Sequence, residues 1–141
     1  MEAALGGSVI KIKRDNEVET ILQRVHLFKE IDRDKLAELV PWLTVKKFSR
    51  HDLIYKKGDE ATNLYIIKEG EVSIMKSDNS GVTRRFQQGA HFGERSLISN
   101  EPRSRNVRAE TAVELWALSK EDFEELVPAG IIQMIKDTMQ L

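Results

Sequence analysis

Short β-strand patterns separated by turn signals occupy the middle of this chain of 141 residues. Apolar and β-branched residues recur in short runs about every ten residues, which is the strand spacing of all-β folds. Gly58-Asp59, Glu69-Gly70 and a polar segment at 78–81 interrupt these runs as turns. Many short strands joined by regular turns predict a β-sandwich or a β-barrel. The predicted strands cover residues 43–45, 53–55, 64–67, 72–75, 82–86, 106–109 and 113–118.

Helical patterns precede the strands. From Asn16 onward, apolar residues follow the i, i+3, i+4, i+7 spacing of an amphipathic helix. A second helix is predicted between Asp32, a candidate N-cap, and Pro41, which cannot continue a helix. The apolar stripe of the first helix consists of Val18, Ile21, Leu22 and Val25.

Helical patterns also interrupt and follow the strands. A short helix is predicted at 93–99. Ser119 and Asp122 resemble a capping box with Asp in place of Glu, which predicts a helix start. Pro128 and Gly130 are expected to separate that helix from a final one.

The composition excludes several classes of protein. A chain of this length, with 40% hydrophobic and 32% charged residues, is expected to form one globular domain. It has no cysteine, so disulfides and thiolate metal sites are impossible. The sequence has no apolar run long enough to span a bilayer, and no signal peptide is recognisable, so we expect a cytoplasmic location. A net charge of -1 argues against a nucleic-acid binder.

Arginine is concentrated in one stretch. Between Lys76 and Lys120 there is no lysine but there are six arginines, and residues 84–108 carry four net positive charges. Arginine differs from lysine in its planar fork, which binds phosphate or carboxylate through two nitrogens. The stretch therefore suggests an anion site, although a solvated strand face of chance composition is the simpler alternative.

Signatures of catalysis and metal binding are missing from the sequence. The histidines at 26, 51 and 91 lie far apart, and neither the nucleophile motif G-x-S-x-G nor the phosphate loop G-x-x-x-x-G-K-S/T is present. We therefore predict no catalytic residue, no metal and no cofactor.

Residues 92–104 combine groups that suit a nucleotide. Gly93 at the start of a short helix lets backbone N–H groups approach an anion, and Arg103 after the rigid Pro102 can offer its fork to that anion. Glu94 would repel a phosphate but could accept a hydrogen bond from a sugar hydroxyl. One arginine, several amides and no Mg²⁺ ligands suit a singly charged phosphodiester better than a triphosphate.

The same residues resemble the phosphate-binding cassette of the cyclic nucleotide-binding domain family, F-G-E-x-A-L-x(4)-P-R-T/S/A-A. The order of patterns in residues 16–141 is similar to that family, and Gly58, Gly70 and Gly93 match its turn glycines. The resemblance implies an α+β fold: an eight-stranded β jelly-roll barrel with N-terminal helices, a short phosphate-binding cassette helix and C-terminal helices.

The resemblance also implies roles for single residues. Glu94 would bind the ribose 2′-hydroxyl, Arg103 an exocyclic phosphate oxygen, and the amides of Gly93, Ser96 and Ser104 the rest of the phosphate. Ser96 and the pair Arg105-Asn106 depart from the family's usual Ala and Ala-Thr. Arg105 could clash, pair with an acid such as Asp137 on the final helix, or point outward.

Two positions indicate the base. In the cyclic GMP-dependent kinases of this family a Thr or Ser follows the cassette arginine, as Ser104 does here, and an arginine ten residues before the glutamate, here Arg84, can read guanine. We therefore expect cGMP to bind better than cAMP. Because side chains alternate along a strand, Arg85 could occupy that register in place of Arg84. The candidate ligand-binding residues are Arg84, Gly93, Glu94, Arg95, Ser96, Arg103 and Ser104.

The resemblance implies an allosteric regulatory domain. Residues 1–15 are expected to be a flexible lead and residues 16–141 the domain, excised from a serine/threonine kinase. The domain would inhibit the linked catalytic domain. Nucleotide binding would relieve this inhibition by shifting the helices of residues 119–141. One alternative is a cAMP sensor from a kinase regulatory subunit, channel or exchange factor. Another is a degenerate docking module that binds nothing. A cupin-type enzyme would need a histidine-rich metal site, and the sequence offers no histidine pair.

Overall fold

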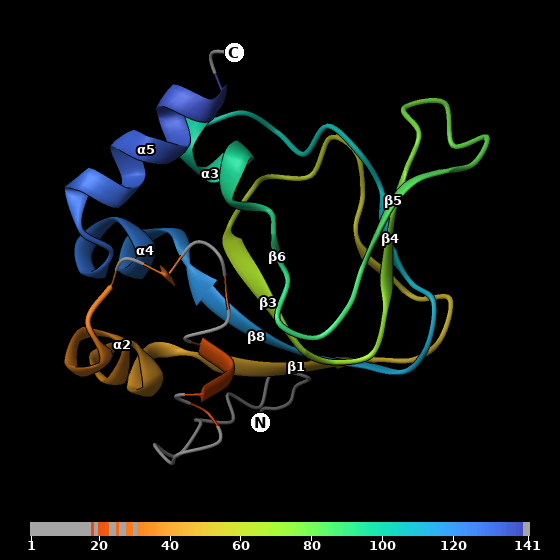
Figure 1. The fold of residues 1–141 in the computed structure, drawn as a ribbon. Coiled ribbons are helices and arrows are strands. Elements are labelled where there is room, and N and C mark those ends of the chain that lie inside the picture. Colours follow the sequence, from red (N-terminus) through yellow and green to blue (C-terminus); the bar gives the residue numbers. More distant parts are fainter. Residues whose placement is uncertain (1–17, 19, 23–24, 26–27, 30, 140–141) are drawn as a thin grey trace, which may run out of the picture.

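The computed structural model describes residues 18, 20–22, 25, 28–29 and 31–139 (Figure 1). Within these residues, eight strands form two four-stranded antiparallel sheets. The first sheet has the order β1 (Thr44–Phe48), β8 (Val113–Ser119), β3 (Asn63–Glu69), β6 (His91–Phe92). The second has the order β2 (Leu53–Tyr55), β7 (Val107–Ala109), β4 (Val72–Met75), β5 (Val82–Phe86).

This arrangement is a jelly-roll, which confirms the predicted fold class. All seven predicted strands are present, and β2, β4 and β5 have the predicted bounds. The family resemblance implied an eighth strand, but the residue patterns did not locate it; it is β6. It contains two residues, so it offers no run in which an alternation could be recognised.

The central strands β3 and β8 separate two hydrophobic cores. In β3, Leu64 and Ile66 face the helices, while Tyr65 and Ile67 face the second sheet. Where a strand is buried on both faces it is apolar at every position, which explains the continuous apolar runs Leu64–Ile67 in β3 and Leu115–Leu118 in β8. We call the core between the sheets the barrel core; it contains Ile54, Tyr65, Ile67, Val72, Phe92, Val107, Ala109, Val113, Leu115 and Ala117.

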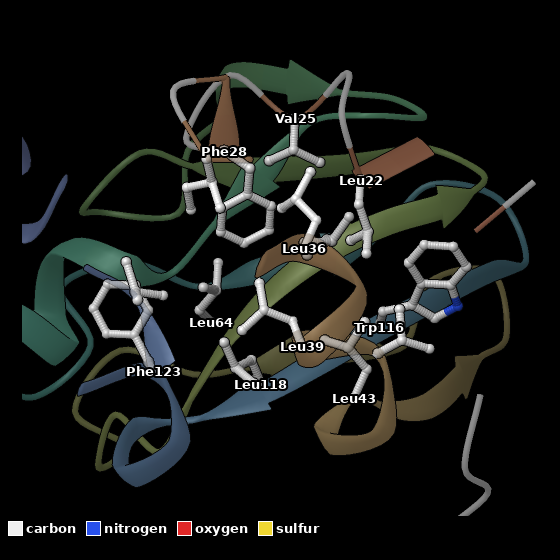
Figure 2. Packing of buried hydrophobic residues seen from close by; sticks show 14 of the residues in the cluster. Leu22, Val25, Phe28, Leu36, Leu39, Leu43, Leu64, Trp116, Leu118 and Phe123 are labelled. Atoms are coloured by element: carbon white, nitrogen blue, oxygen red, sulfur yellow. The ribbon is translucent and has the colours of Figure 1, made fainter. Parts of the chain in front are cut away.

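The second core lies between the first sheet and the helices, and we call it the helix-side core. Figure 2 shows Leu36 and Leu39 packed toward Trp116 and Leu118 of β8, with Phe123 at one end. The helices are α2 (Arg33–Leu39), the 3₁₀ turn η2 (Val40–Trp42), α3 (Glu94–Ser99), α4 (Lys120–Leu126) and α5 (Ala129–Met139).

The helix boundaries differ from the prediction in two details. Pro41 ends α2 as expected, but the chain continues into η2, where proline lies near the N-terminus of a 3₁₀ turn and loses no hydrogen bond. Gly130 does not separate α4 from α5, because α5 begins at Ala129 and includes it. Asp32 occupies the N-cap position of α2, but its side chain makes no capping hydrogen bond.

The predicted N-terminal helix is only partly described. Val18 and residues 20–22 are helical, and Val18, Ile21, Leu22 and Val25 are all buried, as the apolar stripe predicted. The predicted flexible lead at 1–15 lies outside the described residues.

Among the described residues, none of the helices combines the length and apolar character that crossing a membrane requires. In the same part of the chain, His, Asp and Glu side chains form no cluster of three that could hold a metal ion.

Candidate functional site

The junction between β6 and α3 depends on Gly93. Its φ of +93° is a conformation that residues with a Cβ rarely adopt. A Cβ at this position would lie 3.0 Å from Nη1 of Arg103 and 3.3 Å from the carbonyl oxygen of Asn63. Glycine therefore serves both the turn into α3 and the close approach of Arg103.

Arg103 is almost completely buried, with 3% of its surface exposed. Its Nη1 donates to the carbonyl oxygen of Gly93 (2.6 Å) and its Nη2 to that of Asn63 (2.5 Å). The guanidinium carbon lies 4.0 Å from the centre of the Tyr55 ring, within cation–π range. The guanidinium is thus held in one orientation by two carbonyls and one aromatic face.

The charge of Arg103 has no acidic partner among the described residues. The ion pairs found there join Lys35 to Glu38, His91 to Glu94 and Arg108 to Glu110. The Nε atom of Arg103 is also buried without a hydrogen-bond acceptor. Because a buried cation and a buried unsatisfied donor are both costly, this arrangement suits the arrival of an anion.

The chain around Arg103 is fixed against the turn after β2. The Arg103 amide donates to the carbonyl of Asp59 (2.8 Å), and the Gly58 amide donates to the carbonyl of Arg103 (2.8 Å). Further on, the Lys57 amide donates to Oδ1 of Asn106 (2.7 Å). The second sheet therefore sets the position of the cassette's end.

Glu94 is the first residue of α3, and 12% of its side chain is exposed. One carboxylate oxygen, Oε1, is hydrogen-bonded to Nδ1 of His91. Gly93 gives α3 no side-chain cap, so the first-turn N–H groups have no acceptor from that residue. The carboxylate and these donors both lie at the start of α3.

The Tyr55 ring, which contacts Arg103, belongs to a cluster of three aromatic rings. Tyr65 and Phe92 stack with centres 5.3 Å apart, and Tyr55 lies 6.2 Å and 6.1 Å from them. Burial raises the pKa of Tyr55 to about 12, although the positive charge of Arg103 opposes the shift. Burial also raises the pKa of Tyr65, so both phenols are neutral beside the arginine.

The other predicted residues of the cassette differ in exposure. Ser96 is half-buried, while Ser104 and Arg95 are exposed. Ser96 also helps to close α3, since its carbonyl accepts from the amide of Asn100. The structure thus groups Gly93, Glu94, Ser96 and Arg103, and leaves the side chains of Arg95 and Ser104 at the surface.

The strand register separates Arg84 from Arg85. Arg84 pairs with Ile74 and Arg85 with Ser73, and paired side chains share a face of the sheet. Ile74 and Phe86 pack against the barrel core, and the guanidinium of Arg84 lies 4.7 Å from the centre of the Phe86 ring. Arg84 is therefore on the same face as the barrel core, and Arg85 is on the outer face.

Arg105 does not pair with Asp137, which was one of the possibilities considered from the sequence. Its Nη1 donates to the carbonyl of Met75 at the end of β4 (3.4 Å), and the side chain is half-buried. Asp137 accepts instead from Gln133 on its own helix (2.9 Å).

Sequence reasoning missed three residues of this site. Tyr55, Asn63 and His91 contact Arg103 or Glu94 from strands that are remote in the sequence or carry no motif. Asn63 contributes a backbone carbonyl, which any residue could supply. The only sequence signal was that His91 precedes Glu94 by three residues.

Comparison with known proteins supports the resemblance. Residues 45–129 match a family model described as the cyclic nucleotide-binding domain. The chain is 32% identical to cGMP-dependent protein kinase 2 of Mus musculus over 119 residues, which are 81% of this chain and 16% of that protein. It is 36% identical to a cyclic nucleotide-gated channel of Caenorhabditis elegans over 107 residues, 72% of this chain and 15% of that one. The chain therefore spans about a sixth of these relatives.

A solved structure shares the fold. The regulatory domain of Toxoplasma gondii PKA with cAMP aligns with a TM-score of 0.79 and 24% identity, over 87% of this chain and 48% of that one.

Proposed function

Because the chain belongs to the cyclic nucleotide-binding domain family, we propose that it binds a cyclic nucleotide at residues 93–104, with a preference for cGMP over cAMP. We also propose that it is a regulatory domain without catalytic activity of its own, linked to a serine/threonine kinase in the cytoplasm. The kinase relative supports this second part.

The observation that carries the proposal is the buried guanidinium of Arg103. It is 3% exposed, it has no ion-pair partner among the described residues, and its buried Nε lacks an acceptor. A cyclic phosphate supplies one negative charge and several acceptor oxygens, which is what this group lacks. A neutral nucleoside would leave the cation uncompensated.

The remaining cassette groups fit the rest of a cyclic nucleotide. The carboxylate of Glu94 is the acceptor available for a ribose 2′-hydroxyl, and the amides of Gly93, Ser96 and Ser104 are donors for the phosphate. Their positions around the start of α3 support these roles.

Two residues support the preference for cGMP. Ser104 is exposed beside Arg103, so its hydroxyl is available to the guanine 2-amino group. Arg84 lies on the face of β5 that carries Phe86 and the barrel core, where a base could contact it. Adenine lacks the 2-amino group, so it loses the contact with Ser104, and it lacks the oxygen at position 6, so it offers Arg84 one acceptor fewer.

Paired calorimetric titrations with cGMP and cAMP test the proposal. We expect both to bind, cGMP at least about tenfold more tightly, because the two additional contacts to guanine together contribute roughly 1.4 kcal/mol or more. Arg103→Gln should weaken both by about 100-fold, since it removes hydrogen bonds from a charged group. Arg85→Gln is the matched control on the outer face and should bind normally.

Three results would contradict parts of the proposal. Tighter binding of cAMP would overturn the cGMP preference, and equal effects of Arg84→Gln and Arg85→Gln would remove Arg84 from the site. No binding of either nucleotide by the folded chain would identify a degenerate module.

The regulatory part rests on the position of α3. Leu97 of α3 and Ile131 of α5 are both buried in the helix-side core, and the two helices pack together. We propose that occupancy of the cassette shifts the population of α5 positions and so relieves inhibition of the linked kinase.

A further inference from the structure

His91 contacts Glu94, the proposed ribose-binding residue, across the β6–α3 junction. His91 is fixed by strand pairing, since it lies opposite Ile66 of β3. Its Nδ1 is hydrogen-bonded to Oε1 of Glu94, and the two side chains are only 21% and 12% exposed. An ionised carboxylate has no proton to donate, so Nδ1 carries the hydrogen and donates it.

Without His91, the carboxylate of Glu94 would have another attractive partner. Gly93, the residue directly before Glu94, lies against the guanidinium of Arg103, where a Cβ would be 3.0 Å from Nη1. Arg103 is 3% exposed and the side chain of Glu94 is 12% exposed, so both charges lie in surroundings of low dielectric constant. A direct ion pair between them would occupy the proposed sugar acceptor and the proposed phosphate donor together.

In the structure, the charged groups of Glu94 and Arg103 do not form an ion pair. Among the described residues Arg103 has no acidic partner, and Glu94 is paired with His91 instead. The contact with His91 occupies Oε1 and leaves Oε2 as the free acceptor of the carboxylate.

We propose that His91 is a positioning residue, which holds Glu94 away from Arg103 and directs its free oxygen toward the ribose 2′-hydroxyl. The site thereby selects ribonucleotides over 2′-deoxyribonucleotides. This inference rests on the proposed function, because it assigns the orientation of a group within that same site.

Two variants of His91 separate its hydrogen bond from its size. His91→Phe keeps a ring of similar size but removes the donor. His91→Asn places an amide N–H where Nδ1 stands, so it should restore the bond. Thermal unfolding of each unliganded variant confirms that it is folded before binding is measured.

Calorimetric titration with cGMP and with 2′-deoxy-cGMP is the test. We expect His91→Phe to weaken cGMP binding by about tenfold, the effect of one hydrogen bond to a charged group, and to leave 2′-deoxy-cGMP unchanged within twofold. His91→Asn should recover most of the loss. In a Glu94→Gln background, His91→Phe should have no further effect on cGMP.

The other outcomes contradict either this inference alone or the proposed function as well. If His91→Phe weakens the binding of both nucleotides equally, or of neither, His91 does not act through the 2′-hydroxyl and the inference fails. The proposed function still holds in that case, provided that the wild-type chain binds cGMP. If the folded wild-type chain binds neither cGMP nor 2′-deoxy-cGMP, the proposed function fails and the inference fails with it.

Discussion

Gly93 has two separable constraints, its positive φ and its contact with Arg103. Gly89 has a similar φ of +86°, but a Cβ there would meet nothing within 4 Å. Gly89→Ala should therefore cost about 1 kcal/mol of unfolding free energy from backbone strain alone. Gly93→Ala should cost about 1 kcal/mol more, because the added methyl group displaces the guanidinium.

Urea unfolding of both variants, with cGMP titration, measures this difference. Gly93→Ala should also weaken nucleotide binding, whereas Gly89→Ala should leave it intact. Equal losses in the two variants would show that the approach of Arg103 does not constrain residue 93.

The raised pKa of Tyr55 predicts that the protein loses stability at alkaline pH. Burial raises its pKa to about 12 from an ordinary value of 10.0. The folded state favours the neutral phenol. The contribution of Tyr55 to the free energy of unfolding is therefore complete below pH 10. It is lost as the pH rises from 10 to 12, because in that range the phenol ionises in the unfolded chain but not yet in the folded one. A shift of this size corresponds to roughly 2–3 kcal/mol.

Comparison with Tyr55→Phe isolates this contribution, because all other ionisable groups are the same in both proteins. Stability should fall less steeply between pH 10 and 12 in the variant. Identical slopes would show that the phenol of Tyr55 ionises equally in both states.

The residues of the site were predicted unequally from the sequence. Arg103 and Glu94 stand in a long motif, and their chemistry already indicated an anion and a hydroxyl. Tyr55, Asn63 and His91 were missed because they reach the site through strand pairing and the order of strands in the sheets. The choice between Arg84 and Arg85 likewise needed the observed register of β4 and β5.

At the level of elements, α4 begins with the cap that its sequence predicted. The Ser119 Oγ accepts from the Asp122 amide (3.1 Å), and Glu121 and Asp122 place negative charge in the first turn. Ser119→Ala should cost about 1 kcal/mol of unfolding free energy by removing this acceptor.

Urea unfolding checks the effect of the cap, with Ser77→Ala in the exposed turn after β4 as the matched control. The control should change stability by less than about 0.5 kcal/mol. A loss no larger at Ser119 than at Ser77 would show that the cap does not stabilise α4.

Elements that carry a local signal were predicted well, and those that depend on packing were not. β3 and β8 were recognisable because burial on both faces keeps their central residues apolar. β6 is a strand only because β3 lies beside it, and Gly130 is helical although its position two residues after Pro128 suggested a break. Neither fact is encoded within a few residues.

At the scale of the whole molecule, the first sheet separates the proposed ligand site from the C-terminal helices. The barrel core lies on one face of β3 and β8, and the helix-side core on the other. α3 joins the two sides, because Glu94 begins it at the site while Leu97 is buried in the helix-side core. Figure 1 shows α3 lying next to α5.

This connection predicts where ligand binding should be detected at a distance. Saturating cGMP should slow amide hydrogen exchange in α5, because ordering of α3 restricts the helix packed against it. Exchange in α2 should change less, because α3 packs more closely against α5 than against α2. Arg103→Gln at the same nucleotide concentration is the control and should show no slowing. If cGMP saturates the wild-type chain and α5 exchanges at its unliganded rate, α3 does not transmit occupancy to the C-terminal helices, and any regulation of a linked kinase must follow another route.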